Sequence, residues 1–148
     1  MTMKGLLVIE DGDEYVEFAR LFLADRFRVL VARNLAAAET CLTDDPGISA
    51  LLIDLRFDRA PPETLTGDVG HTASTLFAGD LVRARRYLED HQGALILAAL
   101  RQAGHTQPAV FVHDFPPRRL DNLRRLYGRV DAVPTFDAAA LRRALGGV

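Results

Sequence analysis

Three acidic residues follow apolar segments that have the composition of buried strands. Glu10 and Asp11 come directly after the apolar run 6–9, and Asp54 lies near the end of the run 48–55, ISALLIDL. Carboxylates that converge repel one another unless a cation lies among them, and Mg²⁺ prefers carboxylate and carbonyl oxygens. A carboxylate beside such an ion can also act as a nucleophile in phosphoryl transfer. The plainer interpretation is that Asp11 caps a helix and Asp54 is a loop acid.

Short apolar runs alternate along the chain with segments of helical spacing. Strands are expected over residues 6–9, 27–32, 48–55, 108–113 and 130–134. Parallel strands joined by helices need a sheet that is covered on both faces. We therefore predict an α/β fold, a flavodoxin-like doubly wound sheet of five parallel strands in the order 2-1-3-4-5, with an insert after the third strand.

Helix start signals fall between these strands. The expected N-caps are Asp13, Asn34, Asp80 and Asp137. A pair of prolines, 116–117, opens a helix in which Leu120, Leu123 and Leu126 are expected to face inward. The sequence leaves open whether Gly93 separates two helices or lies inside one long helix.

The expected sheet order places the acids at one edge. In such sheets, ligands bind beyond the carboxyl ends of strands one and three, where the strand order reverses. Glu10 and Asp11 follow the first of these strands, and Asp54 lies near the end of the second. The sequence therefore predicts a cation site at this edge.

Two segments resemble the receiver domain of response regulators in two-component signalling. LLVIEDGDEYVEFARLFL, residues 6–23, resembles the receiver's first strand, acidic pair and first helix, and ALLIDLRF, residues 50–57, resembles its third strand. Asp11 and Asp54 are 43 residues apart, about the separation found in that family. The resemblance covers residues 4–57 and, more loosely, about 92–145.

The resemblance implies a role for each acid. Asp54 would be the phospho-acceptor, and Mg²⁺ would be held by Glu10, Asp11, Asp54 and the backbone carbonyl of Arg56. The expected partner is a histidine kinase or another signalling protein, or a small phospho-donor, which supplies the phosphoryl group.

Two residues of the family pattern are missing. His113 stands where receivers end strand four in threonine or serine, and strand five carries no lysine, because the one lysine among eighteen basic residues is Lys4. The segment 131–132 also lacks the aromatic residue of that strand. The resemblance is therefore to an atypical receiver or pseudo-receiver.

Three residues are candidates to lie near a phosphoryl group in place of the missing ones. They are His113, Arg56 and Arg59, since guanidinium binds phosphate well and imidazole donates a hydrogen bond. The alternative is a backbone-bonded His113 and arginines that are solvated surface charges.

An insert is expected at about 58–91, within a single domain of residues 1–148. Asp54 and His113 are 59 residues apart, about twice the separation in the family. We expect the insert to form a lid, to extend the third helix, or to add a helix that covers one face or binds a partner. Its apolar residues need burial on the domain or in a dimer; they include Leu76, Phe77, Leu81, Tyr87 and Leu88.

Three functions are compatible with these residues. The first is a degenerate receiver that signals through protein–protein interaction, without enzymatic activity. The alternative is a functional phospho-accepting receiver that uses Asp54 and Mg²⁺. A Mg²⁺-dependent phosphohydrolase fits less well, because such sites usually place a second acid two residues after the first, and Arg56 stands there.

Composition limits the location and the partners. A net charge of −2 gives no basic field for nucleic acid, and no apolar run is long enough for a membrane span. A single cysteine, Cys41, and the absence of a signal peptide indicate a cytoplasmic protein, whose output we expect from a separate protein. Arginines on the helix after Pro117 and on the last helix favour a partner or homodimer surface there, formed with strand five, and the insert is the other candidate dimer surface.

Overall fold

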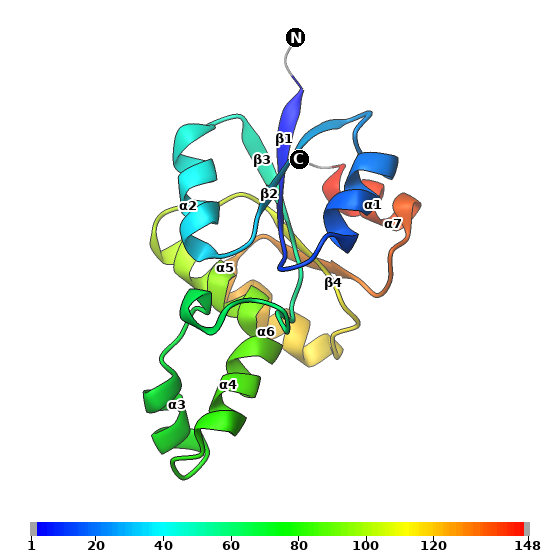
Figure 1. The fold of residues 1–148 in the computed structure, drawn as a ribbon. Coiled ribbons are helices and arrows are strands. Elements are labelled where there is room, and N and C mark those ends of the chain that lie inside the picture. Colours follow the sequence, from blue (N-terminus) through cyan, green and yellow to red (C-terminus); the bar gives the residue numbers. More distant parts are fainter. Residues whose placement is uncertain (1–2, 147–148) are drawn as a thin grey trace.

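Five parallel strands form the centre of the computed structural model, which describes residues 3–146 (Figure 1). The strands are β1 (Lys4–Ile9), β2 (Phe27–Ala32), β3 (Ile48–Ile53), β4 (Ala109–Val112) and β5 (Val130–Val133). They pair in the order β2-β1-β3-β4-β5, and every pair is parallel. This confirms the predicted sheet, although β3 ends at Ile53 rather than at residue 55.

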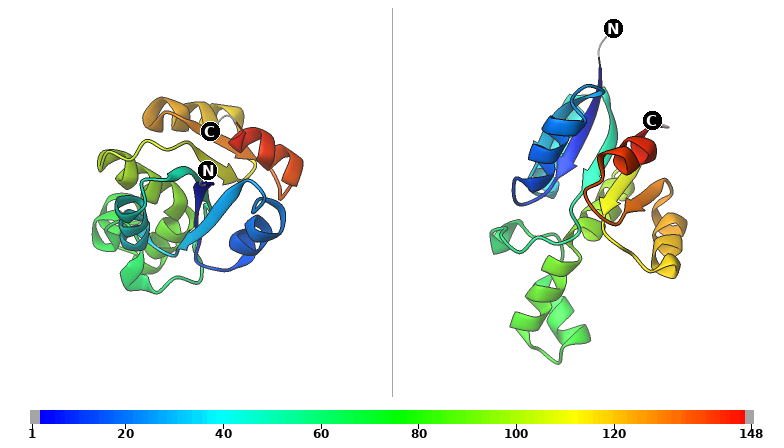
Figure 2. Two further views of the ribbon diagram at one scale, coloured as in Figure 1. Left: turned by 90° about the horizontal axis from the view of Figure 1, so that it is seen from above. Right: turned by 90° about the vertical axis from the view of Figure 1, so that its right-hand side faces the viewer.

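Helices cover both faces of the sheet (Figures 1 and 2). One face carries α1 (Glu14–Phe22) and α7 (Ala138–Leu145), and the other carries α2 (Leu35–Asp44), α5 (Gln92–Gln102) and α6 (Pro117–Tyr127). Side chains of β1 alternate between the two cores, as a strand requires: Leu6 and Val8 face α1, whereas Leu7 and Ile9 face α2 and α5. Within residues 3–146, no helix has the length and apolarity needed to cross a membrane.

Three of the four expected N-caps are confirmed, and the fourth is wrong. Asn34, Asp80 and Asp137 each accept a hydrogen bond from a backbone N–H of the helix that follows. Asp13 precedes α1 but makes no side-chain cap, because its carboxylate pairs with Arg33 at 2.6 Å. The buried carboxylate of Glu10 caps α1 instead.

The inward face of α6 differs from the expected one. Leu123 is buried, but Leu126 is 68% exposed, so the prediction for Leu126 is wrong. Tyr127 packs against the core in its place. The reason is the helical repeat, because residue 127 lies seven positions after Leu120 and four after Leu123, on the same side of the helix.

The segment expected as an insert forms a helical hairpin that projects from the carboxyl edge of the sheet (Figures 1 and 2). A short 3-10 turn, η1 (Pro62–Thr64), leads into α3 (Val69–Leu76) and α4 (Leu81–Asp90). Leu88 is buried and Phe77 packs on Tyr87, with ring centroids 5.7 Å apart. Leu76 and Leu81 are more than half exposed, so the domain itself does not bury them.

The base of the hairpin is bonded to the segment that follows β3. Phe57 N–H donates to the Glu89 carbonyl at 2.8 Å, and Gly93 N–H donates to the Leu55 carbonyl at 2.9 Å. Gln92 is buried and exchanges two hydrogen bonds with the backbone of Thr66. Gly93 lies in the first turn of α5, and the break between α4 and α5 falls at His91.

Gly93 leaves no room for a side chain. A Cβ there would overlap the Asp54 carbonyl oxygen and lie 2.9 Å from the Cα of Leu55. We predict that Gly93→Ala lowers the free energy of unfolding in urea by about 1–3 kcal/mol, the usual cost of overpacking. This loss exceeds the gain in helix propensity, which is about 1 kcal/mol.

Gly70→Ala is the matched control, because Gly70 is also helical but its added Cβ would meet only Asp68 Oδ1, at 3.5 Å. The control should be as stable as the wild type, or more stable. A Gly93→Ala variant that matches the control would contradict the close approach.

Candidate functional site: the acidic edge of the sheet

The register of β1 and β3 brings the three acids together. Ile9 pairs with Ile53, and Asp54 N–H donates to the Ile9 carbonyl at 2.9 Å. Glu10, Asp11 and Asp54 therefore leave the sheet at neighbouring points. They are close enough for the charges of Glu10 and Asp11 to act on Asp54.

Asp54 is the acid whose charge is least compensated by its surroundings. Burial, together with the negative charges of Asp11 and Glu10, raises its pKa to about 7. The Arg56 N–H donates to Asp54 Oδ1 at 3.2 Å and works in the opposite direction, as does the Tyr15 hydroxyl. Without a cation, the Asp54 carboxyl therefore titrates near neutral pH.

Glu10 is fully buried, and its carboxylate caps the N-terminus of α1, the helix that follows it. Its two carboxylate oxygens accept the N–H groups of Tyr15 and Val16, at 3.0 and 2.7 Å. Burial raises the pKa of Glu10, and these two hydrogen bonds lower it in part. A carboxylate at a helix N-terminus is also favoured by the helix dipole. Both oxygens of Glu10 are thus engaged, and its contribution to the site is its charge.

Asp11 has one engaged oxygen and one unengaged oxygen. Oδ2 accepts the N–H of Arg59 at 2.6 Å. Oδ1 is buried and has no hydrogen-bond partner among the described residues. An unpaired buried acceptor costs about 1–3 kcal/mol, so this oxygen favours a bound cation or water.

Two arginines hold the loop between β1 and α1. Arg59 pairs with Glu14 at 2.9 Å, and its guanidinium lies where a side chain on Gly12 would be. Arg33 donates to the Gly12 carbonyl at 2.5 Å. The hydrogen bond from Arg59 lowers the pKa of Glu14 to about 2. The structure therefore places Arg59 beside Asp11 through its backbone, while its side chain is committed to Glu14.

His113 follows β4, and its ring packs on Phe115, on the face of the sheet opposite to the one that Tyr15 contacts. Its backbone N–H donates to the Val133 carbonyl at 2.9 Å, and its imidazole ring meets the Phe115 ring edge-on, with centroids 4.5 Å apart. Burial lowers the pKa of His113, and the charges of Arg56 and Arg119 lower it further. The imidazole is therefore neutral near pH 7. The exposed Arg56 guanidinium is near enough for its positive charge to lower the pKa of His113.

Tyr15 is a site residue that the sequence interpretation missed. It lies one residue into the first turn of α1, and its hydroxyl donates to the Val112 carbonyl at the end of β4, at 3.3 Å. The same hydroxyl lies close enough to the Asp54 carboxylate for each group to shift the pKa of the other. The available signal was a tyrosine, with a polar tip on an aromatic ring, soon after the acidic pair.

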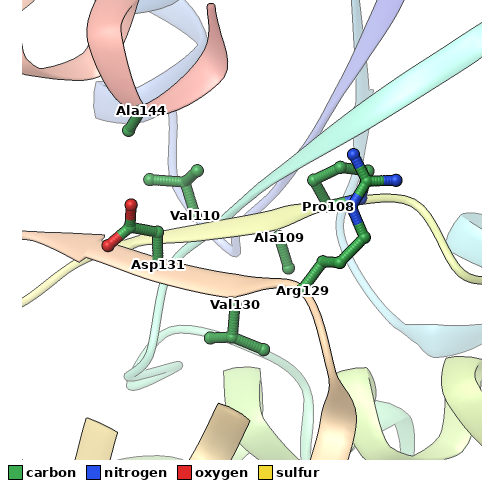
Figure 3. A pocket seen from close by; sticks show the side chains of 7 residues that line it. All are labelled: Pro108, Ala109, Val110, Arg129, Val130, Asp131 and Ala144. Atoms are coloured by element: carbon green, nitrogen blue, oxygen red, sulfur yellow. The ribbon is translucent and has the colours of Figure 1, made fainter. Parts of the chain in front are cut away.

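A separate pocket lies at the opposite end of the sheet, near the amino ends of β4 and β5 (Figure 3). It has a volume of about 220 Å³ and is lined by Pro108, Ala109, Val110, Arg129, Val130, Asp131 and Ala144. Apart from Ala144 on α7, these residues lie at the starts of β4 and β5, whereas the acids follow the ends of β1 and β3. Within residues 3–146, no group of three or more acidic, histidine or cysteine side chains is arranged so that it could hold a metal ion, either here or at the acidic edge.

No model of a protein family and no curated protein sequence matches this chain. Solved structures of response regulators do match its fold. A response regulator receiver protein from Pseudomonas putida superposes with a TM-score of 0.65 at 14% identity, over 100% of this chain and 99% of that one. The chemotaxis response regulator CheY4 of Vibrio cholerae gives a TM-score of 0.63 at 13% identity, over 99% and 98% of the two chains. A response regulator receiver domain protein from Clostridium thermocellum gives 0.64 at 12% identity, over 98% and 93%. The chain therefore has the fold of a response-regulator receiver domain, as the segments around its first and third strands implied.

Proposed function

We propose that the chain is a signal-transduction receiver that accepts a phosphoryl group on Asp54 and acts through protein–protein interaction. The observation that carries the proposal is the unpaired, buried Oδ1 of Asp11, next to an Asp54 whose carboxyl is desolvated and repelled by its neighbours. Such a pair of acids is costly to the protein alone and becomes favourable when a cation binds.

Two carboxylates can suffice for Mg²⁺, because this ion usually keeps several waters and is bound through only one or two carboxylates. Asp11 and Asp54 would hold the ion, together with the Arg56 carbonyl that the receiver resemblance implies. Glu10 would contribute only its negative charge, because both of its oxygens accept N–H groups at the N-terminus of α1. When bound, the ion would neutralise charge on the incoming phosphoryl group and on the acids.

Asp54 would act as the nucleophile. One of its carboxylate oxygens would form a bond to the phosphorus of a phosphohistidine in a kinase, or of a small acyl phosphate. The bond from phosphorus to the donor nitrogen or oxygen would break, and the donor would leave with that electron pair. Asp54 must be ionised to attack, so a cation that favours its charged form promotes the reaction.

A second candidate is a degenerate receiver that binds its partner without phosphorylation. Two observations favour it: β5 carries no lysine, and the Arg59 N–H already occupies one oxygen of Asp11. The binding surface would then be the hairpin of α3 and α4, where Leu81 and Val82 are exposed, or the surface of α6, β5 and α7. Either surface could also pair two copies of the chain.

Phosphorylation distinguishes the two candidates. We expect acetyl phosphate and Mg²⁺ to add the mass of one phosphoryl group to the wild type, and none to Asp54→Asn, by intact-protein mass spectrometry. Asp58→Asn is the matched control, because Asp58 is an exposed acid in the same loop, and it should be modified like the wild type. If the wild type and Asp54→Asn behave alike, the degenerate receiver is the better description.

The charge of Asp54 predicts how stability depends on pH. The folded carboxyl has a pKa of about 7, above its ordinary value of 3.8, so the folded state binds this proton more tightly than the unfolded state. The stability contributed by the protonated form is present below pH 4 and is lost as pH rises towards 7. In metal-free buffer, Asp54→Asn should therefore be more stable than the wild type at pH 8, by up to about 4 kcal/mol.

Magnesium should reduce that difference at pH 8, because it would stabilise the wild type by binding its folded state. Urea unfolding with EDTA or with excess Mg²⁺ measures both effects. Equal stabilisation of the wild type and Asp54→Asn by Mg²⁺ would argue against an ion at Asp54.

A further inference from the structure

Tyr15 lies where four elements of the acidic edge meet. Its backbone N–H donates to Glu10 after β1, and its hydroxyl donates to the Val112 carbonyl at the end of β4. The hydroxyl also interacts with Asp54 after β3, although the side chain belongs to α1. A group bound at Asp54 would therefore lie next to the Tyr15 hydroxyl.

The other candidate donors are worse placed. The Arg59 guanidinium is held by Glu14, with bonds of 2.9 and 3.0 Å to its two carboxylate oxygens. The His113 ring packs against Phe115, on the side of the sheet that carries α5 and α6. The Tyr15 hydroxyl, by contrast, lies near the Asp54 carboxylate, and its hydrogen bond goes to a backbone carbonyl rather than to a charged side chain.

The ring of Tyr15 connects this hydroxyl to the loop between β5 and α7. It meets Phe136 edge-on, with centroids 4.7 Å apart, and Phe136 also contacts Phe18 at 5.0 Å. Phe136 is 40% exposed and precedes Asp137, which caps α7. Arg142 on α7 donates to the Phe22 carbonyl of α1 at 2.7 Å, so the two helices that flank this cluster are also joined (Figure 1).

We propose that Tyr15 donates its hydroxyl hydrogen bond to the phosphoryl group on Asp54, and that the accompanying shift of its ring moves Phe136 and the loop 134–137. Tyr15 would then supply the hydrogen bond that the missing strand-five lysine makes in receivers. This inference rests on the proposed function, because it needs an anionic group at Asp54.

The physical basis is competition for a single proton. The hydroxyl now lies between two acceptors, the Val112 carbonyl and the Asp54 carboxylate, and it can donate to only one at a time. Phosphoryl oxygens are stronger acceptors than the Val112 carbonyl, because hydrogen bonds to ionised groups are shorter and stronger than those to neutral groups. A tyrosine hydroxyl has an ordinary pKa of about 10, so near neutral pH it is a protonated donor.

The test uses beryllium fluoride with Mg²⁺ as the phosphoryl mimic, followed by two-dimensional amide NMR. In the wild type, we expect titration to shift the amides of residues 54–57 at the site and the non-proline amides of 134–138 in the loop. Tyr15→Phe keeps the ring and removes the hydroxyl. It should bind the mimic about tenfold more weakly, or worse, and lose most of the loop response even at saturation.

Phe136→Leu separates positioning from transmission. It keeps the Tyr15 hydroxyl but removes the edge-on ring contact, so it should bind with wild-type affinity and show a reduced loop response. Tyr127→Phe is the control tyrosine, since Tyr127 lies on α6, and it should behave like the wild type in both measurements.

Each outcome decides a separate point. Wild-type affinity in Tyr15→Phe would overturn the hydrogen bond, and an undiminished loop response in both Tyr15→Phe and Phe136→Leu would overturn the transmission. In either case the proposed phospho-acceptor would stand. A wild type whose residues 54–57 do not respond to the mimic would overturn the proposed function, and this inference with it.

Discussion

The parallel pairing of β1 with β3 is the constraint on which the acidic edge depends. Because Ile9 lies beside Ile53 and Asp54 donates to the Ile9 carbonyl, the residues that follow the two strands must leave the sheet together. The three carboxylates differ in the number and length of the hydrogen bonds that they accept. Glu10 receives two N–H groups of α1, Asp11 receives one from Arg59, and Asp54 receives a longer one from Arg56. The uncompensated charge therefore collects between Asp11 and Asp54, where a cation would have the greatest effect.

A second constraint ties the hairpin to the same loop. The carbonyl of Leu55 is bonded to Gly93, and the N–H of Phe57 is bonded to Glu89, so the chain that follows Asp54 is fixed at both ends of the α4–α5 junction. Phe57 is almost fully buried, which anchors this segment in the core. These hydrogen bonds couple the loop to the base of α4 and to the start of α5. The projecting helices are joined through these hydrogen bonds to the loop that follows Asp54, although their exposed tip lies away from it (Figure 1).

The parts of the structure that follow local rules could be predicted, and the parts set by tertiary contacts could not. The alternation of strands and helices predicts a parallel sheet, whose order follows from the flavodoxin-like fold, and Asn34, Asp80 and Asp137 cap the helices that begin beside them. Asp13 follows the same local rule and fails, because a buried Glu10 competes for the same N–H groups. Tyr15 was missed for a similar reason. Its hydroxyl meets a carbonyl 97 residues away in sequence, a contact that helical spacing cannot reveal.

The absence of the strand-five lysine changes the electrostatics of this edge more than its geometry. Lys4, at the start of β1, lies at the other end of the sheet from the acids. A lysine amine would both donate a hydrogen bond and cancel one negative charge, whereas the Tyr15 hydroxyl can only donate. With Tyr15 in that role, the carboxylates of Glu10 and Asp11 and the phosphoryl group on Asp54 would have to be balanced by the bound metal ion and by backbone N–H groups. The phosphorylated state of this chain would therefore depend on Mg²⁺ more strongly than a state in which a lysine shares the charge.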